Sequence, residues 1–448
     1  MYRDTIAAIA TPPGHGGIGV VRLSGAECRA VAERLFDGAL KDHYLAHGHI
    51  RDPKSGDVVD EVLVAFMAAP RTYTREDVVE ISCHGSPLVL QRVLELALEH
   101  GARLATPGEF TLRAFLNGRL DLAQAEAVLD VIQAQSRASL RIAIAGLGGR
   151  LSEPIHRARL QLVQVQAYLT ACIDFPEDEV EAQIAIDPKG LLVECREDLE
   201  RLLASADAGA VYRQGVRTAI VGKPNVGKSS LLNRLLGEDR AIVTPIPGTT
   251  RDTVEEVVTV RGVPFHLIDT AGIQDTADVV EHMGIERSRK ALEQADLLLL
   301  VVDGSAPLSA EDGRVLAAVQ GKKALTIANK ADLPLKADVA GLPQPVVRVS
   351  ALTGAGMEDL HEAMAKAALG GQVIASDAVM VTNPRHKAAL EGALRHVRTA
   401  EASMRAGTPE DFVTIDLAAA LNHLGQITGE NAGEDVLDAI FRQFCIGK

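Results

Sequence analysis

The stretch "GKPNVGKSS", Gly222 to Ser230, decides the fold of the middle of the chain. It fits the pattern G-x-x-x-x-G-K-[ST] and lies between the apolar run "RTAIVG" and the helical run "SLLNRLLG", the context that a phosphate-binding loop requires. Backbone N–H groups of such a loop, with the N-terminus of the following helix, surround phosphate oxygens. We therefore expect Lys228 to contact the β- and γ-phosphates of a nucleotide during catalysis, and the Ser229 hydroxyl to bind Mg²⁺.

Four further motifs surround the phosphates and the base. "GTTRD" supplies Thr250, expected to close over the γ-phosphate and complete the Mg²⁺ shell, and "DTAG" supplies Asp269 with the backbone N–H of Gly272. The Asp332 carboxylate in "NKAD" can accept both the N1–H and the exocyclic amine of guanine, donors that adenine lacks there, so it selects GTP over ATP. "SAL", Ser350 to Leu352, is expected to contact the base through its backbone.

Together the five motifs predict a guanine-nucleotide domain. Strands are expected at "RTAIVG", "EEVVTV", "FHLIDT", "DLLLLVVD", "KALTIANK" and "VVRVSA", and most are continuous apolar runs. That pattern is typical of a mainly parallel sheet covered on both faces, as in a Ras-like P-loop G domain. The residues expected to contact GTP are Asn225, Val226, Gly227, Lys228, Ser229, Ser230, Thr244, Pro245, Ile246, Pro247, Gly248, Thr249, Thr250, Asp269, Thr270, Ala271, Gly272, Asn329, Lys330, Ala331, Asp332, Ser350, Ala351 and Leu352.

The flanking sequence predicts an α+β domain over residues 1–118 and a helical domain in two parts, 119–213 and 372–448, with the G domain inserted at 214–371. In the α+β part the strands are expected at Thr5–Ala10, Val20–Leu23, Val58–Met67 and Val78–His84, and a helix is expected to end at Gly101. In the helical parts, buried faces are expected at Leu162, Val165 and Leu169, and at Leu437, Ile440, Phe441 and Phe444. Asn431 and Glu434 have the spacing of a capping box.

The net charge, the aromatic content and the cysteines of the chain limit the classes of function to be considered. The net charge of -14 disfavours a large sequence-independent grip on nucleic acid, and 3% aromatic residues without Trp disfavour base-stacking platforms. The scattered cysteines Cys28, Cys83, Cys172, Cys195 and Cys445 indicate neither a disulfide framework nor a zinc site. The N-terminus lacks signal-peptide architecture and no apolar run approaches the ~18 residues of a membrane span, so we expect a cytoplasmic protein.

The residue after "DTAG" raises a question about hydrolysis. Ras-like GTPases have there a glutamine that orients the attacking water, whereas this chain has Ile273, which forms no side-chain hydrogen bond. The carbonyl-rich "TPIPGTT" beside Asn225 can hold a monovalent cation near the phosphates, and Glu281 can orient water. On the residues alone, a solvated acid at a helix end explains Glu281 equally well.

The five motifs, the opening "DTIAAIATPPGHGGIGVVRLSG", "CHG", "NGRLDLAQAEAV" and the final "FCIGK" resemble the MnmE (TrmE) family of tRNA-modification GTPases over essentially the whole chain. The resemblance implies an N-terminal folate-binding (GcvT-like) domain that dimerises, a helical domain and an inserted G domain. It implies a heterotetramer with the flavoprotein MnmG, which carries FAD. That complex, which holds most of the tRNA, would install a carboxymethylaminomethyl or aminomethyl group at C5 of the wobble uridine, using a 5-formyl or methylene tetrahydrofolate unit.

The resemblance also implies residue roles. Potassium would lie on the Asn225 side chain and on backbone oxygens of Thr244, Ile246 and Thr249 when two G domains meet, and Glu281 would position the attacking water through a second water. Folate would contact Arg22, Glu80, Arg119 and Lys448, and Cys445 matches the family's functional cysteine. The family commonly has Lys where this chain has Arg119, so a planar fork replaces a point charge there.

Other interpretations stay open at this stage. Gly14, Gly16 and Gly19 match G-x-G-x-x-G, but the following "VVRLSG" predicts a strand where a dinucleotide site needs a helix, so we expect a loop near the folate. A structural role is expected for His84 beside Cys83. Alternative functions are a GTPase switch in ribosome assembly or signalling, and a folate enzyme that GTP regulates. The sequence leaves open the one-carbon donor, the set of tRNAs, the nitrogen source, the role of Cys445 and the timing of hydrolysis.

Overall fold

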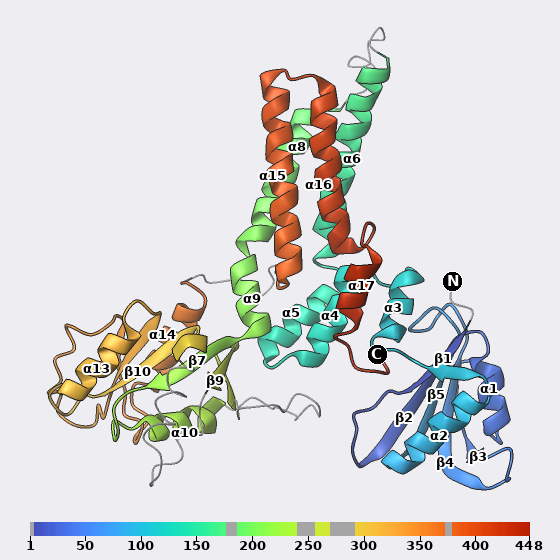
Figure 1. Cartoon of the computed structure of the whole chain (residues 1–448), viewed down its shortest axis with the longest axis horizontal. Coiled ribbons are helices and arrows are strands. Elements are labelled where there is room, and N and C mark those ends of the chain that lie inside the picture. Colours follow the sequence, from blue (N-terminus) through green and yellow to red (C-terminus); the bar gives the residue numbers. More distant parts are fainter. Residues whose placement is uncertain (1–3, 176–185, 240–255, 269–291, 372–378) are drawn as a thin grey trace. The chain divides into compact units, whose positions relative to one another are not determined.

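The computed structural model describes residues 4–175, 186–239, 256–268, 292–371 and 379–448 (Figure 1). Packing divides the chain into two compact units. The first unit combines Met1–Leu129, Leu147–Ser152 and Leu424–Lys448, and the second combines Asp130–Gly146 and Glu153–His423. No helix in the described ranges is long and apolar enough to cross a membrane.

The first unit is built on a six-stranded sheet in the order β3-β4-β5-β2-β1-β6. All neighbours pair antiparallel except β1 and β6, which are parallel. Two helices cover one face, where Val31, Leu90 and Leu96 pack against strand residues such as Val21 and Ile81 (Figure 1). The elements are β1 (Thr5–Ile9), β2 (Gly16–Ser24), α1 (Cys28–Leu35), β3 (Tyr44–Arg51), β4 (Val58–Met67), β5 (Val78–Gly85), α2 (Pro87–Glu99) and β6 (Ala102–Leu104).

The strands predicted near residues 5, 20, 58 and 78 are all present, and α2 ends two residues before Gly101. Strand β2 begins at Gly16, inside the glycine-rich loop, so the G-x-G-x-x-G match leads into a strand and not into a nucleotide-binding helix. Strands β3 and β6 were not predicted from the sequence. The stretch "YLAHGHIR" of β3 is half polar because it is an edge strand with an exposed face.

Three further helices complete or border this unit: α3 (Glu109–Leu116), α4 (Leu122–Gln133) and α17 (Glu434–Phe441). The predicted stripe on α17 is confirmed, since Ile440, Phe441 and Phe444 are buried against Leu122 and Leu129 of α4. The predicted capping box is wrong. Helix α17 starts at Glu434 with Gly433 as its N-cap and no side-chain cap, so the glutamate is the first helical residue, too early to reach back to a cap.

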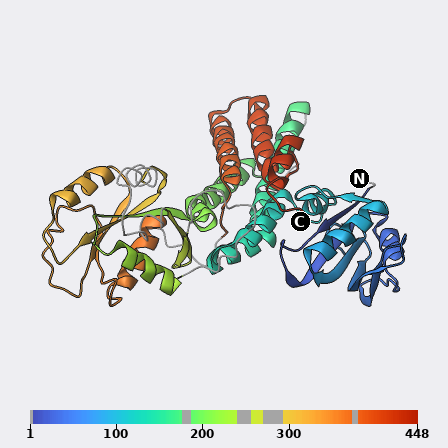
Figure 2. The same ribbon diagram turned by 60° about the horizontal axis from the view of Figure 1, so that its bottom comes forward.

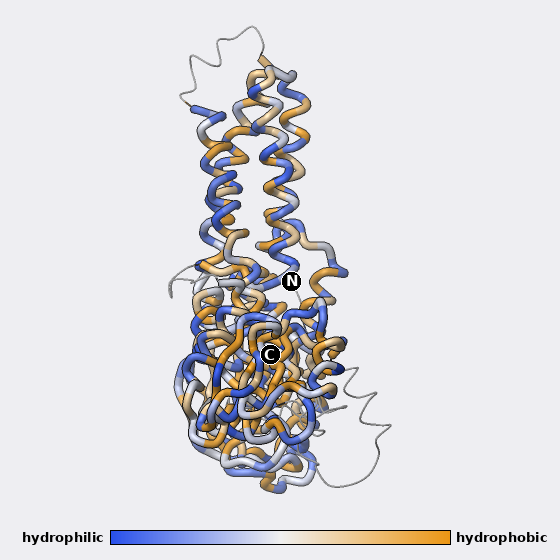
Figure 3. The backbone as a smooth tube through the Cα atoms, turned by 90° about the vertical axis from the view of Figure 1, so that its left-hand side faces the viewer, coloured by the Kyte–Doolittle hydropathy of each residue, from blue (hydrophilic) through white to orange (hydrophobic). Residues whose placement is uncertain are grey.

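In the second unit four long helices run side by side (Figures 1 and 2): α6 (Ser152–Asp174), α8 (Pro188–Ala204), α15 (Pro384–Ala406) and α16 (Glu410–Thr428). Two shorter helices are α5 (Arg137–Leu147) and α9 (Ala206–Gln214). Hydrophobic and hydrophilic residues alternate along these helices (Figure 3), and the predicted buried face of α6 is confirmed, with Leu162, Val165 and Leu169 at 0%, 0% and 4% exposure.

Helices α8 and α15 lie before and after the G domain in sequence, yet they pack together. Arg196 of α8 pairs with Glu401 of α15 at 3.2 Å, and Glu200 of α8 pairs with Arg398 of α15 at 2.9 Å. The G domain is therefore inserted between two helices that pack against each other in the same helical bundle.

The G domain has a six-stranded sheet in the order β12-β11-β10-β7-β9-β8, parallel throughout except for the β8–β9 pair. Alternate residues of β10 enter two different cores: Leu299 packs on the side of Leu231, and Leu298 packs on the side of Val319. Both faces are thus buried, which explains the continuous apolar runs. The elements are β7 (Val216–Val221), α10 (Lys228–Asp239), β8 (Glu256–Val260), β9 (Val263–Ile268), β10 (Leu297–Asp303), α13 (Ala310–Val319), β11 (Ala324–Asn329), β12 (Val346–Arg348) and α14 (Met357–Ala368).

Candidate functional site

The phosphate-binding loop joins the carboxyl end of β7 to the first residue of α10, in the middle of the parallel sheet. Ligands of open α/β sheets bind at this end of the strands. Two glycines are required by close approach: a Cβ on Gly222 would lie 2.3 Å from the Val301 carbonyl oxygen, and one on Gly227 would lie 2.2 Å from Asn329 Nδ2. Asn225 has a φ of 61°, a left-handed conformation that asparagine tolerates.

Lys228 lies folded over its own loop. Its ammonium donates to the carbonyl oxygens of Gly222 at 2.9 Å and Lys223 at 2.8 Å, and burial lowers its pKa below the usual value. These partners are neutral, so an anionic phosphate offers the ammonium a stronger contact. Lys223 is also anchored, with its Nζ 2.6 Å from Asp312 at the N-terminus of α13.

The residues predicted to bind the base are Asn329 and the loop after β12. Asn329 donates from Nδ2 to the Val226 carbonyl at 2.8 Å and accepts on Oδ1 from the Ala351 N–H at 3.0 Å. One buried amide therefore connects the phosphate-binding loop to the predicted base-binding loop. The Ser350 hydroxyl donates to Asp332 Oδ1 at 2.5 Å, which fixes the carboxylate predicted to select guanine.

Lys330 lies between Asn329 and Asp332 in the "NKAD" segment. It has a φ of 64°, and its Nζ lies 2.6 Å from Asp303 Oδ2 at the end of β10. Burial alone would raise the pKa of Asp303, but hydrogen bonds from Lys330 and Ser305 hold it below the usual value. The "NKAD" segment is thus fixed by ion pairing on one side and by Ser350 on the other.

Several predicted residues lie outside the described residues. They are Thr244, Pro245, Ile246, Pro247, Gly248, Thr249, Thr250, Asp269, Thr270, Ala271, Gly272, Ile273 and Glu281. Of the predicted potassium set only Asn225 is described, and of the predicted magnesium set only Ser229. In the described ranges no three His, Cys, Asp or Glu side chains are grouped as a metal site.

The predicted folate residues gather in the first unit. Arg22 of β2 faces Glu80 of β5 in the strand register, and its Nε and Nη2 both lie 2.8 Å from Glu80 Oε1. Arg22 Nη1 also donates to the Gly447 carbonyl at 3.3 Å, and Lys448 is held by its backbone, whose carbonyl accepts from the Phe110 N–H at 3.2 Å. Arg22 therefore contacts both the neighbouring strand, through Glu80, and the C-terminal segment, through Gly447.

Two aromatic residues that were not predicted from the sequence, Tyr73 and Phe110, contact the guanidinium groups of these arginines. The Arg119 guanidinium lies 4.7 Å from the centre of the Tyr73 ring and donates to the Tyr73 carbonyl at 2.8 Å. The Arg22 guanidinium lies 6.0 Å from the same ring and 5.7 Å from Phe110. In a chain with 3% aromatic residues, a tyrosine within the charged "RTYTRED" was the available signal.

Cys83 and His84 do not form a catalytic pair. They are consecutive residues of β5, so their side chains point to opposite faces. Cys83 is buried, which raises its pKa to about 12, whereas the exposed His84 donates from Nδ1 to Asp60 at 2.7 Å, and this contact raises its pKa. Cys445, in contrast, is exposed on the C-terminal tail.

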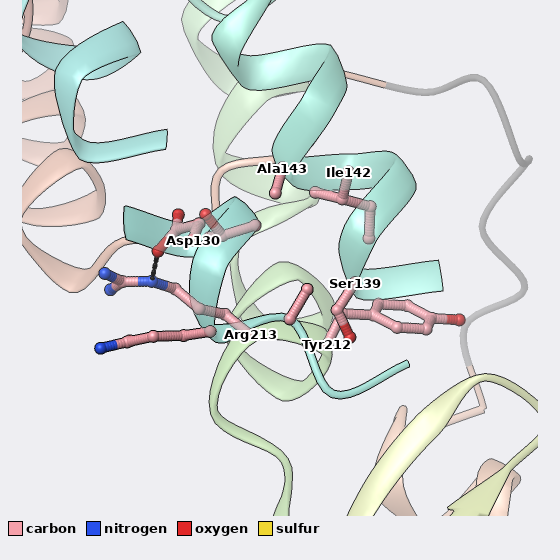
Figure 4. Close-up of a pocket in the computed structure, with 9 residues that line it drawn as sticks. Asp130, Ser139, Ile142, Ala143, Tyr212 and Arg213 are labelled. Carbon is pink, nitrogen blue, oxygen red and sulfur yellow. Dashed lines mark hydrogen bonds and ion pairs between the residues drawn. The ribbon is translucent and has the colours of Figure 1, made fainter. Parts of the chain in front are cut away.

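A small cavity lies between α4, α5 and α9 (Figure 4). Asp130 and Arg213 form an ion pair of 2.7 Å beside it, and Tyr212 and Ser139 contribute to its lining. Its volume of about 30 Å³ matches a single water molecule, so it is not a ligand site.

Two family models together match most of the chain. The family model "GTP-binding protein TrmE N-terminus" matches residues 5–119, and "MnmE helical domain" matches residues 122–445. A solved structure of the G domain of the T. maritima FeoB iron transporter is 27% identical, covering 34% of this chain and 98% of that chain with a TM-score of 0.25.

Curated relatives named "tRNA modification GTPase MnmE" are similar throughout. The protein from Chloroflexus aurantiacus is 52% identical over 99% of this chain and 100% of its own length, and that from Roseiflexus sp. is 50% identical over 100% of both. The protein from Geobacillus kaustophilus is 49% identical over 99% of both chains. With half of its residues identical over its full length, the chain belongs to the MnmE family of tRNA modification GTPases.

Proposed function

We propose that this tRNA modification GTPase is activated by potassium and acts with an MnmG-like flavoprotein on the wobble uridine of tRNA, using a folate-bound one-carbon unit. The observation that carries the nucleotide part is the amide bridge of Asn329 between the phosphate-binding loop and Ala351. Together with the Ser350 contact that fixes Asp332, it provides a preformed site for guanine.

In this proposal Ser229 and Thr250 hold Mg²⁺, which neutralises phosphate charge. Asn225 and the backbone oxygens of Thr244, Ile246 and Thr249 hold K⁺, which adds positive charge where other GTPases use an arginine. The exposed Asn225 supports this, because its neutral amide oxygen in a left-handed turn of the loop is a suitable ligand for an alkali cation. Glu281 then orients water in place of the missing glutamine.

The folate site is supported by the cluster around Tyr73. Both contacts between Arg22 and Glu80 use Oε1, so Oε2 remains able to accept a hydrogen bond from a pterin N–H. The cations of Arg119 and Lys448 suit the glutamate tail. Tetrahydrofolate would carry the one-carbon unit, and the exposed Cys445 on the same tail would take part in the modification chemistry.

These roles divide the chain into functional parts. Residues 1–118 would bind folate and form the homodimer, residues 119–213 and 372–448 would form the helical domain, and residues 214–371 would hydrolyse GTP. Conformational change would couple the two sites, since GTP and folate bind to different units of the chain.

The potassium proposal is tested by GTP turnover in KCl and in NaCl at equal ionic strength. We expect turnover to be many-fold faster in KCl, and Asn225→Ala to abolish that difference while GTP still binds. Asn233→Ala, at an exposed position of α10, is the matched control and should keep the potassium dependence. Equal wild-type rates in the two salts would exclude the potassium role.

The folate proposal is tested by calorimetry with 5-formyltetrahydrofolate, repeated after deletion of Lys448. Absence of heat with the intact chain would instead favour a GTPase switch whose flanking domains act as adaptors. Nucleoside mass spectrometry of tRNA from a strain lacking this protein tests the modification itself.

A further inference from the structure

Arg234 contacts the predicted base-binding loop from the helix that begins at the phosphate-binding loop. Its Nη2 donates to the Leu352 carbonyl at 2.9 Å, and its Nε donates to the Ala351 carbonyl at 3.4 Å. Arg234 follows Lys228 by six residues on α10. One helix therefore carries both the phosphate-binding lysine and a side chain that reaches the base end of the site.

The buried Ser350 and Ala351 side chains hold one end of the loop, and backbone contacts hold the exposed part that follows. The Leu352 side chain is 82% exposed, so it cannot anchor the loop by packing. The loop closes on itself through the Ser350 N–H to the Ala355 carbonyl at 2.8 Å and the Gly354 N–H to the Ser350 carbonyl at 2.8 Å. Asn329, through the Ala351 N–H, and Arg234, through two carbonyls, then attach this closed turn to the rest of the domain.

Gly354 adds a steric reason for the arrangement. It has a φ of 88°, and a Cβ at this position would lie 3.2 Å from Arg234 Nη2. A side chain there would be strained by the backbone conformation and would also crowd the guanidinium. The glycine in "SALTG" thus allows the loop to lie against Arg234.

The direction of these hydrogen bonds matters for base recognition. Arg234 is a donor only, so its contacts occupy the Ala351 and Leu352 carbonyl oxygens and turn them towards α10. The Ala351 N–H donates to Asn329 Oδ1 and the Thr353 N–H donates to Ser350 Oγ, so the Leu352 N–H is the donor that this part of the loop can present to the base. Guanine has an acceptor, O6, where adenine has an amino donor, so a donor on the loop favours guanine.

We propose that Arg234 is a positioning residue for guanine recognition, which holds the Ala351–Leu352 backbone so that the Leu352 N–H faces O6 of the base. The inference rests on the base contact proposed for Ser350 to Leu352. Asp332 reads the N1 and amino edge, and Arg234 acts through the loop on the O6 edge. The site thereby uses two independent elements to select GTP.

The test uses the full chain and three nucleoside diphosphates. GDP has O6, the N1–H and the amino group, inosine diphosphate lacks the amino group, and 2-aminopurine riboside diphosphate lacks O6 together with the N1–H. Dissociation constants are measured for wild type, Arg234→Met, Arg234→Lys and Gly354→Ala, with Arg217→Met as the matched control. Arg217 is exposed and pairs with Asp296 at 3.4 Å, away from the loop.

We expect Arg234→Met to weaken GDP and inosine diphosphate about tenfold, the loss typical of one charged hydrogen bond, and 2-aminopurine riboside diphosphate less than about twofold. Arg234→Lys should restore part of the loss, because lysine donates to one carbonyl. Gly354→Ala should reproduce the same selective loss, which keeps the test valid if Arg234→Met does not fold.

Equal weakening of all three nucleotides, with a lowered melting temperature, would show that Arg234 only stabilises the domain and would overturn the inference. Unchanged GDP binding in Arg234→Met would overturn it as well. If the wild type binds GDP and 2-aminopurine riboside diphosphate equally well, the proposed base contact itself fails, which is a distinguishable result.

Discussion

Arg22 and Glu80 face each other across β2 and β5, and two nitrogens of Arg22 contact the same oxygen of Glu80 at 2.8 Å. A symmetric fork would have used both carboxylate oxygens. The observed geometry binds the arginine tightly and keeps Oε2 for another donor. This asymmetry is what a site needs if its carboxylate must position a cation and also read a ligand.

Glu80→Gln should therefore weaken 5-formyltetrahydrofolate by about tenfold or more, because the amide accepts more weakly and leaves Arg22 without a counter-charge. Calorimetry with the intact chain measures the change. Glu61→Gln is the matched control, since Glu61 pairs with the exposed His47 of the same sheet. Undiminished folate affinity in Glu80→Gln would exclude Glu80 from the site.

We expect the aromatic ring of Tyr73, and not its hydroxyl, to contribute to folate affinity. Tyr73→Leu removes the face shared by Arg22 and Arg119, and two exposed cation–π contacts of ~0.5–1 kcal/mol each correspond to about a tenfold loss of folate affinity. Tyr73→Phe keeps the ring and loses only the 2.9 Å contact of the hydroxyl with Thr111, so it should bind nearly normally. If the phenylalanine and leucine variants behave alike, the ring has no such role.

Asp332→Asn should change the base that the G domain accepts. The asparagine amide can accept from N1–H but meets the guanine amine with a donor, so GTP affinity should fall about 100-fold or more while XTP, with a carbonyl at that position, gains. Competition against a fluorescent GTP analogue measures both. Asp338→Asn, at an exposed residue of the same domain, should leave the preference unchanged.

Glu109 predicts a pH dependence of stability. Burial alone would raise its pKa, but hydrogen bonds from Arg103, the Thr106 N–H and Arg113 lower it to about 2. A folded-state pKa below the ordinary 4.5 means that the stabilisation is complete above about pH 4.5 and is lost as the pH falls towards 2. Glu109→Gln should cost about 3 kcal/mol at neutral pH, since it breaks a buried ion pair.

Denaturant unfolding of wild type and Glu109→Gln at several pH values measures this contribution. The difference between the two should shrink as the pH falls from 4.5 towards 2, and Glu95→Gln, which affects an exposed pair, should show no such trend. A difference that is constant over this pH range would contradict the assignment.

The parts of the molecule that could be predicted are those set by local pattern. Strand β4 has the predicted bounds Val58 to Met67, because its sequence "VVDEVLVAFM" is mostly apolar and rich in valine. The nucleotide motifs could be read because each is a short loop beside a strand or helix end. The capping box failed because spacing alone does not fix where a helix begins, and α17 begins three residues after Asn431.

The contacts that define the sites could not be predicted in the same way. Arg234 reaches a carbonyl 118 residues away, and Arg119 lies on a ring 46 residues away, so both depend on how distant segments pack. Family resemblance predicted that Arg22, Glu80, Arg119 and Lys448 share one site. The contacts of Tyr73 and Phe110 with the arginines follow only from the packed chain.

The hydrogen bond from Arg22 to the Gly447 carbonyl joins residues 425 positions apart. Ribosomes add ~5–20 residues per second, so about 20–85 s of translation separates these two groups. Until Gly447 has been synthesised, Arg22 lacks this partner. The cluster around Arg22 is therefore completed only after the ribosome has translated the inserted G domain.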